Sequence, residues 1–150
     1  MRLIHEDYMR HAIKLAKLAE QAGEVPIGAL IVDDGEIIAE AYNAPIQNND
    51  PSAHAEMIAI RRAGDALHNY RLVNTTLYVT LEPCMMCVGA IVHARIQQVV
   101  FGAYDLRAGA VESQTRLFEA PFLNHRVAWE GGVLSGECAS LLQAFFKQRR

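Results

Sequence analysis

The feature that most constrains the fold of this chain is the alternation of helical periodicity with short apolar runs. Helices are predicted over residues 5–22, 51–63, 84–94 and 136–148. Strands are predicted over residues 27–32, 37–42, 77–81, 99–101 and 127–129. This order predicts an α/β fold, a three-layer α/β/α sandwich built around one mixed five-stranded sheet.

Local signals set several of these boundaries. Asp34-Gly35 between the first two strands is typical of a tight hairpin, which makes those strands antiparallel. After a polar loop over residues 43–49, Asp50 is predicted to be an N-cap and Pro51 the first residue of the second helix. Gly64 is predicted to end that helix. The helix between the third and fourth strands makes that pair parallel.

Length and composition narrow the class of protein. A chain of 150 residues fits one domain of ordinary size, which we expect to span residues 1–150. Hydrophobic residues make up 51% and charged residues 21%, which excludes disordered and fibrous proteins. The 14 Lys and Arg against 17 Asp and Glu give a net charge of −3. That balance argues against a protein that coats nucleic acid without regard to sequence, which would need a basic excess.

The sequence pattern lacks targeting and membrane signals. The chain turns polar directly after its first residues, unlike a signal peptide. No apolar run approaches the roughly 20 residues of a transmembrane helix. Three cysteines do not suggest a disulfide framework. We therefore expect a soluble cytoplasmic protein without a membrane partner, in which clustered cysteines bind metal or do chemistry.

Two short clusters carry the chemistry, His54-Ala55-Glu56 and the pair Cys84 and Cys87. Two cysteines three residues apart at a helix start lie on one face, where the helix dipole favours thiolate. Sulfur ligands with one imidazole select zinc over hard cations. Cys138 is a poor fourth ligand because it has no partner at ligand spacing. Three protein ligands leave one position for water, which is typical of a catalytic zinc site.

Glu56 supplies the proton acceptor that a zinc-activated water still needs. Residues two apart in a regular helix point to nearly opposite sides, so His54 is expected in an irregular first turn. A Cys-x-x-Cys pair alone is more often a structural zinc half-site or a redox pair than a catalytic site, and His-x-Glu alone is uninformative. Together the two motifs are the signature of zinc nucleobase deaminases.

These residues resemble the cytidine deaminase-like superfamily, and more closely the bacterial tRNA-specific adenosine deaminases. The resemblance covers nearly the whole chain, in residues 24–29, 43, 50–56, 77–84, 100–105, 124–127 and 145–150. The chain departs from the family pattern at Glu112, where the family usually has glycine.

The resemblance assigns roles to individual residues. It implies that one zinc ion per chain is held by His54, Cys84 and Cys87, and that Glu56 is the catalytic proton shuttle. It also implies that Asn43 and the backbone of Ala55 orient the base, and that Asp105 lies beside the flipped nucleotide.

The resemblance further implies hydrolytic deamination of adenosine to inosine at the wobble position of a tRNA anticodon, by a homodimer. The predicted contacts to the anticodon stem-loop are basic residues near the carboxyl end, Arg126, Lys147, Arg149 and Arg150. Two alternatives stay open at this point. One is a free-base or nucleoside deaminase for guanine or cytosine on the same fold, and the other is a non-catalytic zinc-bearing RNA-binding module.

Overall fold

The fold was obtained as a computed structural model that describes residues 2–149. The helices are α1 (Arg2–Gln21), α2 (Pro45–Asn48), α3 (Ala55–Leu67), α4 (Met85–His93) and α5 (Ser135–Gln148), with a 3-10 helix, η1, at Leu117–Glu119. The strands are β1 (Gly28–Asp33), β2 (Glu36–Tyr42), β3 (Thr75–Leu81), β4 (Gln98–Ala103) and β5 (Ala128–Glu130). Within residues 2–149, none of the helices has the length and apolar character needed to cross a bilayer.

The strands form one mixed sheet in the order β2-β1-β3-β4-β5. β1 pairs antiparallel with both β2 and β3, whereas β3, β4 and β5 run parallel to one another. The predicted hairpin is confirmed, because Asp34 and Gly35 have φ angles of 51° and 79°, as a tight two-residue turn requires. The predicted parallel pairing of the third and fourth strands is also confirmed.

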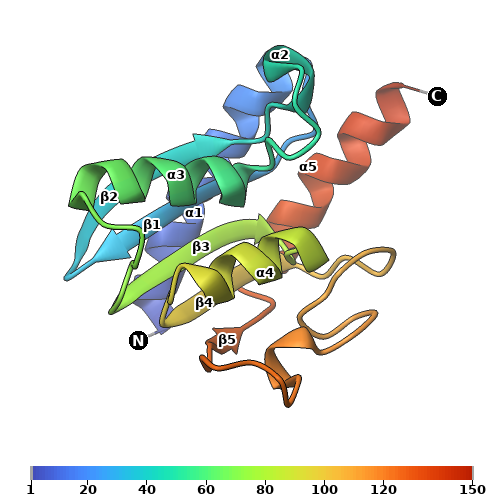
Figure 1. Cartoon of the computed structure of the whole chain (residues 1–150). Coiled ribbons are helices and arrows are strands. Elements are labelled where there is room, and N and C mark those ends of the chain that lie inside the picture. The colour runs from blue at the N-terminus through green and yellow to red at the C-terminus, as the bar shows by residue number, and fades with distance from the viewer. Residues whose placement is uncertain (1, 150) are drawn as a thin grey trace.

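Helices cover both faces of the sheet, so the predicted three-layer sandwich is confirmed (Figure 1). α3 and α4 pack on one face, and α1 and α5 pack on the other. Successive side chains of β3 alternate between these layers: Leu77 and Val79 join the α3 and α4 core, and Tyr78 joins the α1 and α5 core. Both faces are therefore buried, and the carboxyl end of β3 leads directly into the turn before α4.

The packing of α1 on β1 depends on a glycine. A Cβ atom on Gly28 would lie 2.1 Å from the Ala12 carbonyl oxygen and 2.6 Å from the Ala16 amide nitrogen. The backbones of the helix and the strand therefore touch without an intervening side chain. This close approach fixes the position of β1. Its neighbour β3 leads into the turn that holds the predicted ligand Cys84.

The region before α3 differs from the prediction. Residues 43–49, predicted as a loop, contain the short helix α2, which Pro45 begins. The predicted N-cap Asp50 instead accepts hydrogen bonds from the amide (2.9 Å) and hydroxyl (2.8 Å) of Ser52, which makes a turn. The helix consequently begins at Ala55 rather than at residue 51.

The prediction that Gly64 ends this helix is also wrong. α3 continues through Gly64 to Leu67. His68 follows in the left-handed conformation (φ 52°), and its amide donates to the Gly64 carbonyl oxygen. The carbonyl of Gly64 is therefore part of the helix end, although the glycine lies inside the helix.

Candidate active site

Two helix starts bring the three predicted metal ligands together. His54 is the N-cap of α3, with an extended backbone (φ −71°, ψ 153°), and Cys84 is the N-cap of α4. Cys87 lies in the first turn of α4 and is fully buried. The Nδ1 atom of His54 lies 3.6 Å from each of the two sulfur atoms. All three ligand atoms lie within 4.8 Å of one another.

This spacing fits zinc. Zinc bonds of about 2.3 Å to sulfur and about 2.0–2.1 Å to nitrogen, at a tetrahedral angle, place nitrogen and sulfur about 3.6 Å apart. The observed separations of 3.6 Å agree with that value. Within residues 2–149, no other group of three His, Cys, Asp or Glu side chains lies close enough to share one ion. The fourth position is left without a protein ligand, as in catalytic sites.

The two thiols have opposite pKa shifts because they share a hydrogen bond. The pKa of Cys84 is lowered to about 3, first by the hydrogen bond from the Cys87 thiol and then by His54. The same bond raises the pKa of Cys87, and the bond to Cys84 raises the pKa of His54. The three ligand side chains therefore share protons when no metal is bound, and a bound cation would displace these protons.

Glu56 lies beside these ligands, as the second residue of α3. Its side chain is only 5% exposed, and this burial raises the pKa of the carboxyl to about 7. The expected irregular geometry at His54 is confirmed, because the helix begins after His54 and Glu56 is inside it. The two side chains can thus serve one pocket despite their sequence spacing.

His54, Cys84 and Glu56 line a pocket of about 330 Å³, and the third ligand, Cys87, is buried beside them. The lining residues are Val25, Ile27, Asn43, Pro45, His54, Glu56, Leu81, Glu82, Cys84, Asp105 and Ala108. Predicted substrate-binding residues Asn43 and Asp105 are therefore both at the site. Ala55 is the first residue of α3, where amides lack partners within the helix. Two larger hollows, of about 600 and about 820 Å³, lie at the end of α3 and between α1 and α5, and none of these residues lines them.

Residues 3–103 match the family model for the cytidine and deoxycytidylate deaminase zinc-binding region. The chain belongs to this deaminase family. It is 50% identical over 146 residues to the tRNA-specific adenosine deaminase of Haemophilus influenzae, covering 97% of this chain and 84% of the relative. That of Bacillus subtilis is 49% identical, with 97% and 90% covered.

Solved structures share the fold of this deaminase. One, from a study of A-to-I editing by tRNA:A34 deaminases at the wobble position of transfer RNA, superposes with a TM-score of 0.88. It is 44% identical and covers 91% of this chain and 99% of its own. A guanine deaminase from Bacillus subtilis superposes with a TM-score of 0.66 at 37% identity, with 95% and 94% covered.

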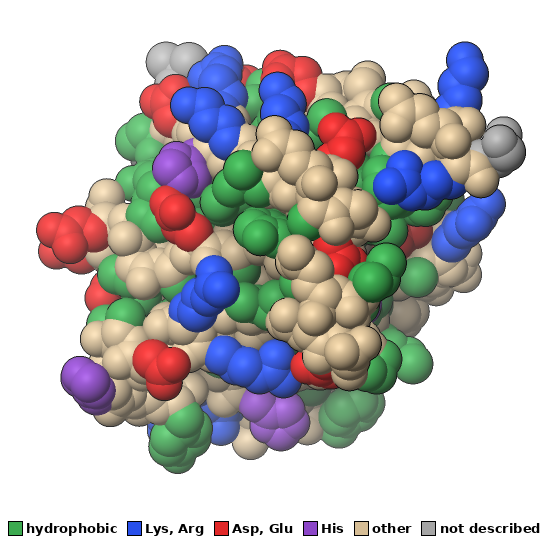
Figure 2. Space-filling model, turned by 90° about the horizontal axis from the view of Figure 1, so that it is seen from above, with side chains coloured by type: hydrophobic (Ala, Val, Ile, Leu, Met, Phe, Trp, Pro, Cys, Tyr) green, Lys and Arg blue, Asp and Glu red, His purple; other side chains and the backbone are tan. Residues whose placement is uncertain are grey.

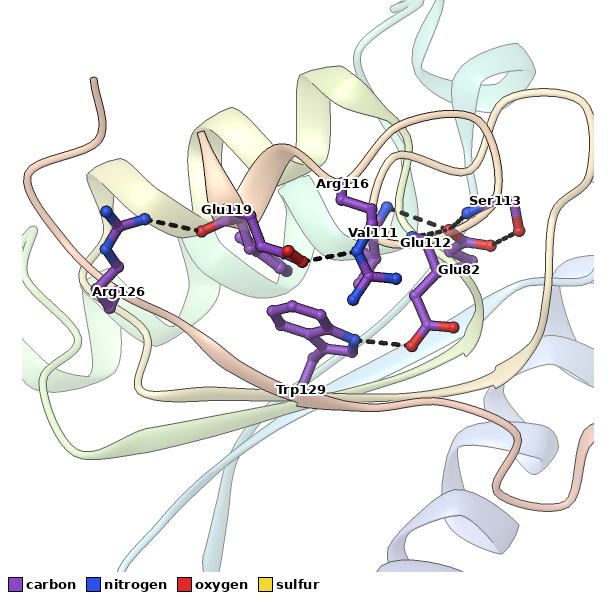
Figure 3. Close-up of polar contacts among 9 residues, drawn as sticks. Glu82, Val111, Glu112, Ser113, Arg116, Glu119, Arg126 and Trp129 are labelled. Atoms are coloured by element: carbon purple, nitrogen blue, oxygen red, sulfur yellow. Dashed lines mark hydrogen bonds and ion pairs between the residues drawn. The ribbon is translucent and has the colours of Figure 1, made fainter. Parts of the chain in front are cut away.

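The three predicted RNA contacts of the deaminase that the structure describes do not form one cluster. The guanidinium of Arg126 donates to the carbonyl oxygens of Phe118 and Ala120, at 3.3 Å each, and so supports η1. Figure 3 shows Arg126 directed toward this segment. Lys147 and Arg149 are exposed at the end of α5. Lys and Arg side chains project at that edge of the molecule, on the right of Figure 2. Arg150 lies outside the described residues.

Sequence reasoning missed two buried carboxylates of the deaminase. Glu82 is 2% exposed and accepts hydrogen bonds from the residue 105–113 segment. Burial acts to raise the pKa of Glu82, but hydrogen bonds from the Glu112 amide and from Ser113 lower it overall. Glu24 is 1% exposed, and its carboxylate accepts hydrogen bonds from the amides of Ile46 and Gln47 at 3.2 and 2.8 Å. The sequence offered one signal for these residues, an acidic residue next to an apolar strand. A carboxylate buried at such a position needs hydrogen-bond partners.

Proposed function

We propose that this deaminase converts adenosine to inosine at the wobble position of a tRNA anticodon. The observation that carries the proposal is a cluster of three zinc ligands at a pocket that a buried carboxyl and an amide side chain also line. The choice of substrate is supported by relatives named tRNA-specific adenosine deaminase that are about half identical to this chain over most of its length.

The residues of the pocket suit hydrolytic deamination. His54, Cys84 and Cys87 would hold the zinc ion, which when bound would supply a water nucleophile at neutral pH by lowering the pKa of water toward about 7. Glu56 accepts a proton as water adds to C6 of the base, and it returns a proton to the exocyclic nitrogen. The C6–N bond then breaks, and inosine and ammonia leave.

Recognition of the base falls to polar groups on the pocket wall. Asn43 is 6% exposed, and its side-chain amide can both donate to and accept from the polar edge of adenine. We further propose the Ala55 amide as a donor to the base, because amides at the start of α3 lack partners within the helix. A pocket of about 330 Å³ is at the small end of ligand sites, as one base demands.

An anticodon loop suits such a pocket because its bases are single-stranded, so extruding one costs little. We place Lys147, Arg149 and Arg150 on phosphates of the stem-loop. Arg126 is a separate contact at η1, and its guanidinium already binds backbone carbonyls there, so its contribution is smaller. A few cations at one edge reconcile RNA binding with a net charge of −3.

A guanine deaminase is the second candidate. The specific observation in its favour is the 37% identity to the solved guanine deaminase over most of both chains. The non-catalytic RNA-binding module is less well supported, because a structural metal needs no buried carboxyl beside an open coordination position.

Substrate comparison tests the proposal. The zinc-loaded protein is given an anticodon stem-loop with adenosine at the wobble position, free adenine, guanine and cytosine, each at the same concentration. We expect inosine in the stem-loop to form at least about 100-fold faster than any free base is deaminated, as a polar site can discriminate. Faster release of ammonia from guanine would replace this proposal with the second candidate.

We further propose a cytoplasmic homodimer, in keeping with the family resemblance and with tRNA as the partner. Three exposed apolar side chains, Ile46, Met85 and Leu106, follow pocket residues in the sequence and are 72%, 75% and 76% exposed. Contact of these three side chains with a second copy of the chain would remove apolar surface from water. Sedimentation equilibrium of the purified protein tests this, with a mass of one chain as the contradicting result.

A further inference from the structure

One buried carboxylate connects the metal-ligand turn to the opposite pocket wall. Glu82 follows β3 and lies two residues before the ligand Cys84. Its Oε1 atom accepts the Asp105 amide at 3.0 Å and also the Ser113 hydroxyl. Its Oε2 atom accepts the amides of Val111, Glu112 and Ser113 at 3.1, 2.7 and 2.9 Å. The segment from 105 to 113 is therefore wrapped around one side chain.

The segment is shaped to this carboxylate. A Cβ atom on Gly109 would lie 2.3 Å from the Glu82 carboxyl carbon and 2.4 Å from its Oε1 atom, so only glycine fits there. The next amide, of Ala110, donates to the carbonyl oxygen of Pro83 at 2.8 Å. The loop thus contacts both Glu82 and the residue between Glu82 and the first cysteine ligand.

A second attachment holds the other side of the segment. The Trp129 indole on β5 donates to the Glu112 carboxylate at 2.9 Å (Figure 3). The guanidinium of Arg116 lies over the same indole, 5.5 Å from its centre, and pairs with Glu119 at 2.6 Å. Glu112, where the family usually has glycine, therefore ties the segment to the sheet edge.

The anchored segment forms part of the pocket. Asp105 and Ala108 line it, and one oxygen of Asp105 accepts the Arg107 and Ala108 amides at 3.1 and 3.2 Å, which fixes the turn. The Asp105 amide is itself held by Glu82. Displacement of the Glu82 carboxylate would thus move this wall relative to the zinc ligands.

We infer that Glu82 is a positioning residue that sets the distance between the metal ligands and the substrate wall at Asp105 and Ala108. The inference rests on the proposed function for its kinetic consequence. An error of about 1 Å in such placement can slow a reaction about 100-fold. Glu82 lines the pocket, but both of its carboxylate oxygens accept hydrogen bonds from the loop, so it would act through the loop and not on the reacting atoms.

Two variants test this. Glu82→Gln places an amide NH₂ against backbone N–H groups and breaks several of the bonds, whereas Ser113→Ala removes only one. We expect Glu82→Gln to keep zinc and to bind the stem-loop within about threefold of wild type, but to lose about 10- to 100-fold in single-turnover rate. Ser113→Ala should show a smaller loss in the same direction, and Glu82→Asp should partly restore the rate.

Amide hydrogen exchange provides a readout that does not depend on the substrate. In Glu82→Gln, exchange over residues 105–113 should accelerate at least tenfold while exchange over α3 stays unchanged. Val100→Ala, a core change on the far face of the sheet, controls for general loss of stability and should leave the single-turnover rate unchanged.

The outcomes separate the two proposals. Unchanged exchange over residues 105–113, loss of zinc, or a wild-type rate in Glu82→Gln overturns the positioning role. A rate loss of equal size in Val100→Ala also overturns it. If the wild-type protein deaminates only guanine, the proposed function fails, and the exchange measurement still decides whether Glu82 anchors the loop.

Discussion

His54 and Glu56 serve one pocket because α3 begins between them. His54 is extended and caps the helix, whereas Glu56 lies inside the first turn. The motif predicted both residues and the need for an irregular turn. The turn itself depends on hydrogen bonds that the Ser52 amide and hydroxyl donate to the Asp50 carboxylate just before the ligand. The motif does not reveal these bonds.

Removal of either cysteine ligand should remove the metal. We expect Cys84→Ala and Cys87→Ala to lose stoichiometric zinc, because two remaining protein ligands hold zinc weakly. Cys138→Ala is the matched control, since Cys138 is buried behind the sheet and should retain zinc. Metal analysis of the three purified variants decides this, and full zinc content in both ligand variants would refute the assignment.

Glu56→Ala should leave the metal in place and stop turnover. General acid and base catalysis contributes about 10²- to 10⁴-fold, so we expect at least a 100-fold loss in the single-turnover rate of inosine formation. The effect should appear in kcat with little change in stem-loop affinity. Normal zinc content is the internal control, and a rate near wild type would exclude the proton-shuttle role.

The buried carboxylates show why a motif gives only part of a site. Glu82 and Glu24 bind backbone amides about 20 to 30 residues away in the sequence. Backbone amides exist at almost every residue, so no residue type marks the partner. The ligands, by contrast, are recognisable because thiols and imidazole are rare and specific donors.

At the scale of helices and strands, periodicity predicted most of the elements to within two residues. β1, β2, β5, α4 and α5 lie within one residue of their predicted bounds. The predictions of a loop at α2 and of a helix start at residue 51 were wrong. Both Pro45 and Pro51 can begin a helix, and the helix begins at Pro45. The choice between them is made by side-chain hydrogen bonds within the loop.

The contact between α1 and β1 predicts a large effect for a small substitution. Gly28→Ala should destabilise the protein by at least about 1–3 kcal/mol, since its Cβ atom would collide with the backbone of Ala12 and Ala16. Gly89→Ala in α4 is the matched control: no atom lies within 4 Å of its Cβ, and we expect about 0.5–1 kcal/mol of stabilisation. Urea unfolding of both variants measures this, and equal midpoints would contradict the close packing.

For the molecule as a whole, the net charge is small, but the charged side chains are unevenly distributed. The net charge is −3, and Lys and Arg alternate with Asp and Glu over much of the face in Figure 2. The end of α5 is an exception, with exposed Lys147 and Arg149. Arg149 lies 3.6 Å from the centre of the Phe145 ring, so its position is defined by packing.

Replacing Lys147, Arg149 and Arg150 together with alanine should weaken stem-loop binding and flatten its salt dependence. Each lost phosphate contact lowers the log–log slope by roughly 0.7 on single strands or 0.9 on duplex. A triple alanine variant of Lys14, Arg61 and Arg71, which are exposed elsewhere on the surface, is the control of equal charge. Binding across a salt series checks this, and equal slopes in both triple variants would show that α5 does not contact phosphate.

The hydrogen bond from Trp129 to Glu112 constrains how this chain can diverge. Loss of Glu112 alone leaves the indole N–H without its acceptor. Loss of Trp129 alone removes one donor from the Glu112 carboxylate, which keeps Tyr104 as a partner, and leaves Arg116 without the ring beneath it. The effects of substitutions at the two positions are therefore not expected to add. The residue at position 112 influences which residues position 129 tolerates, and the reverse also holds.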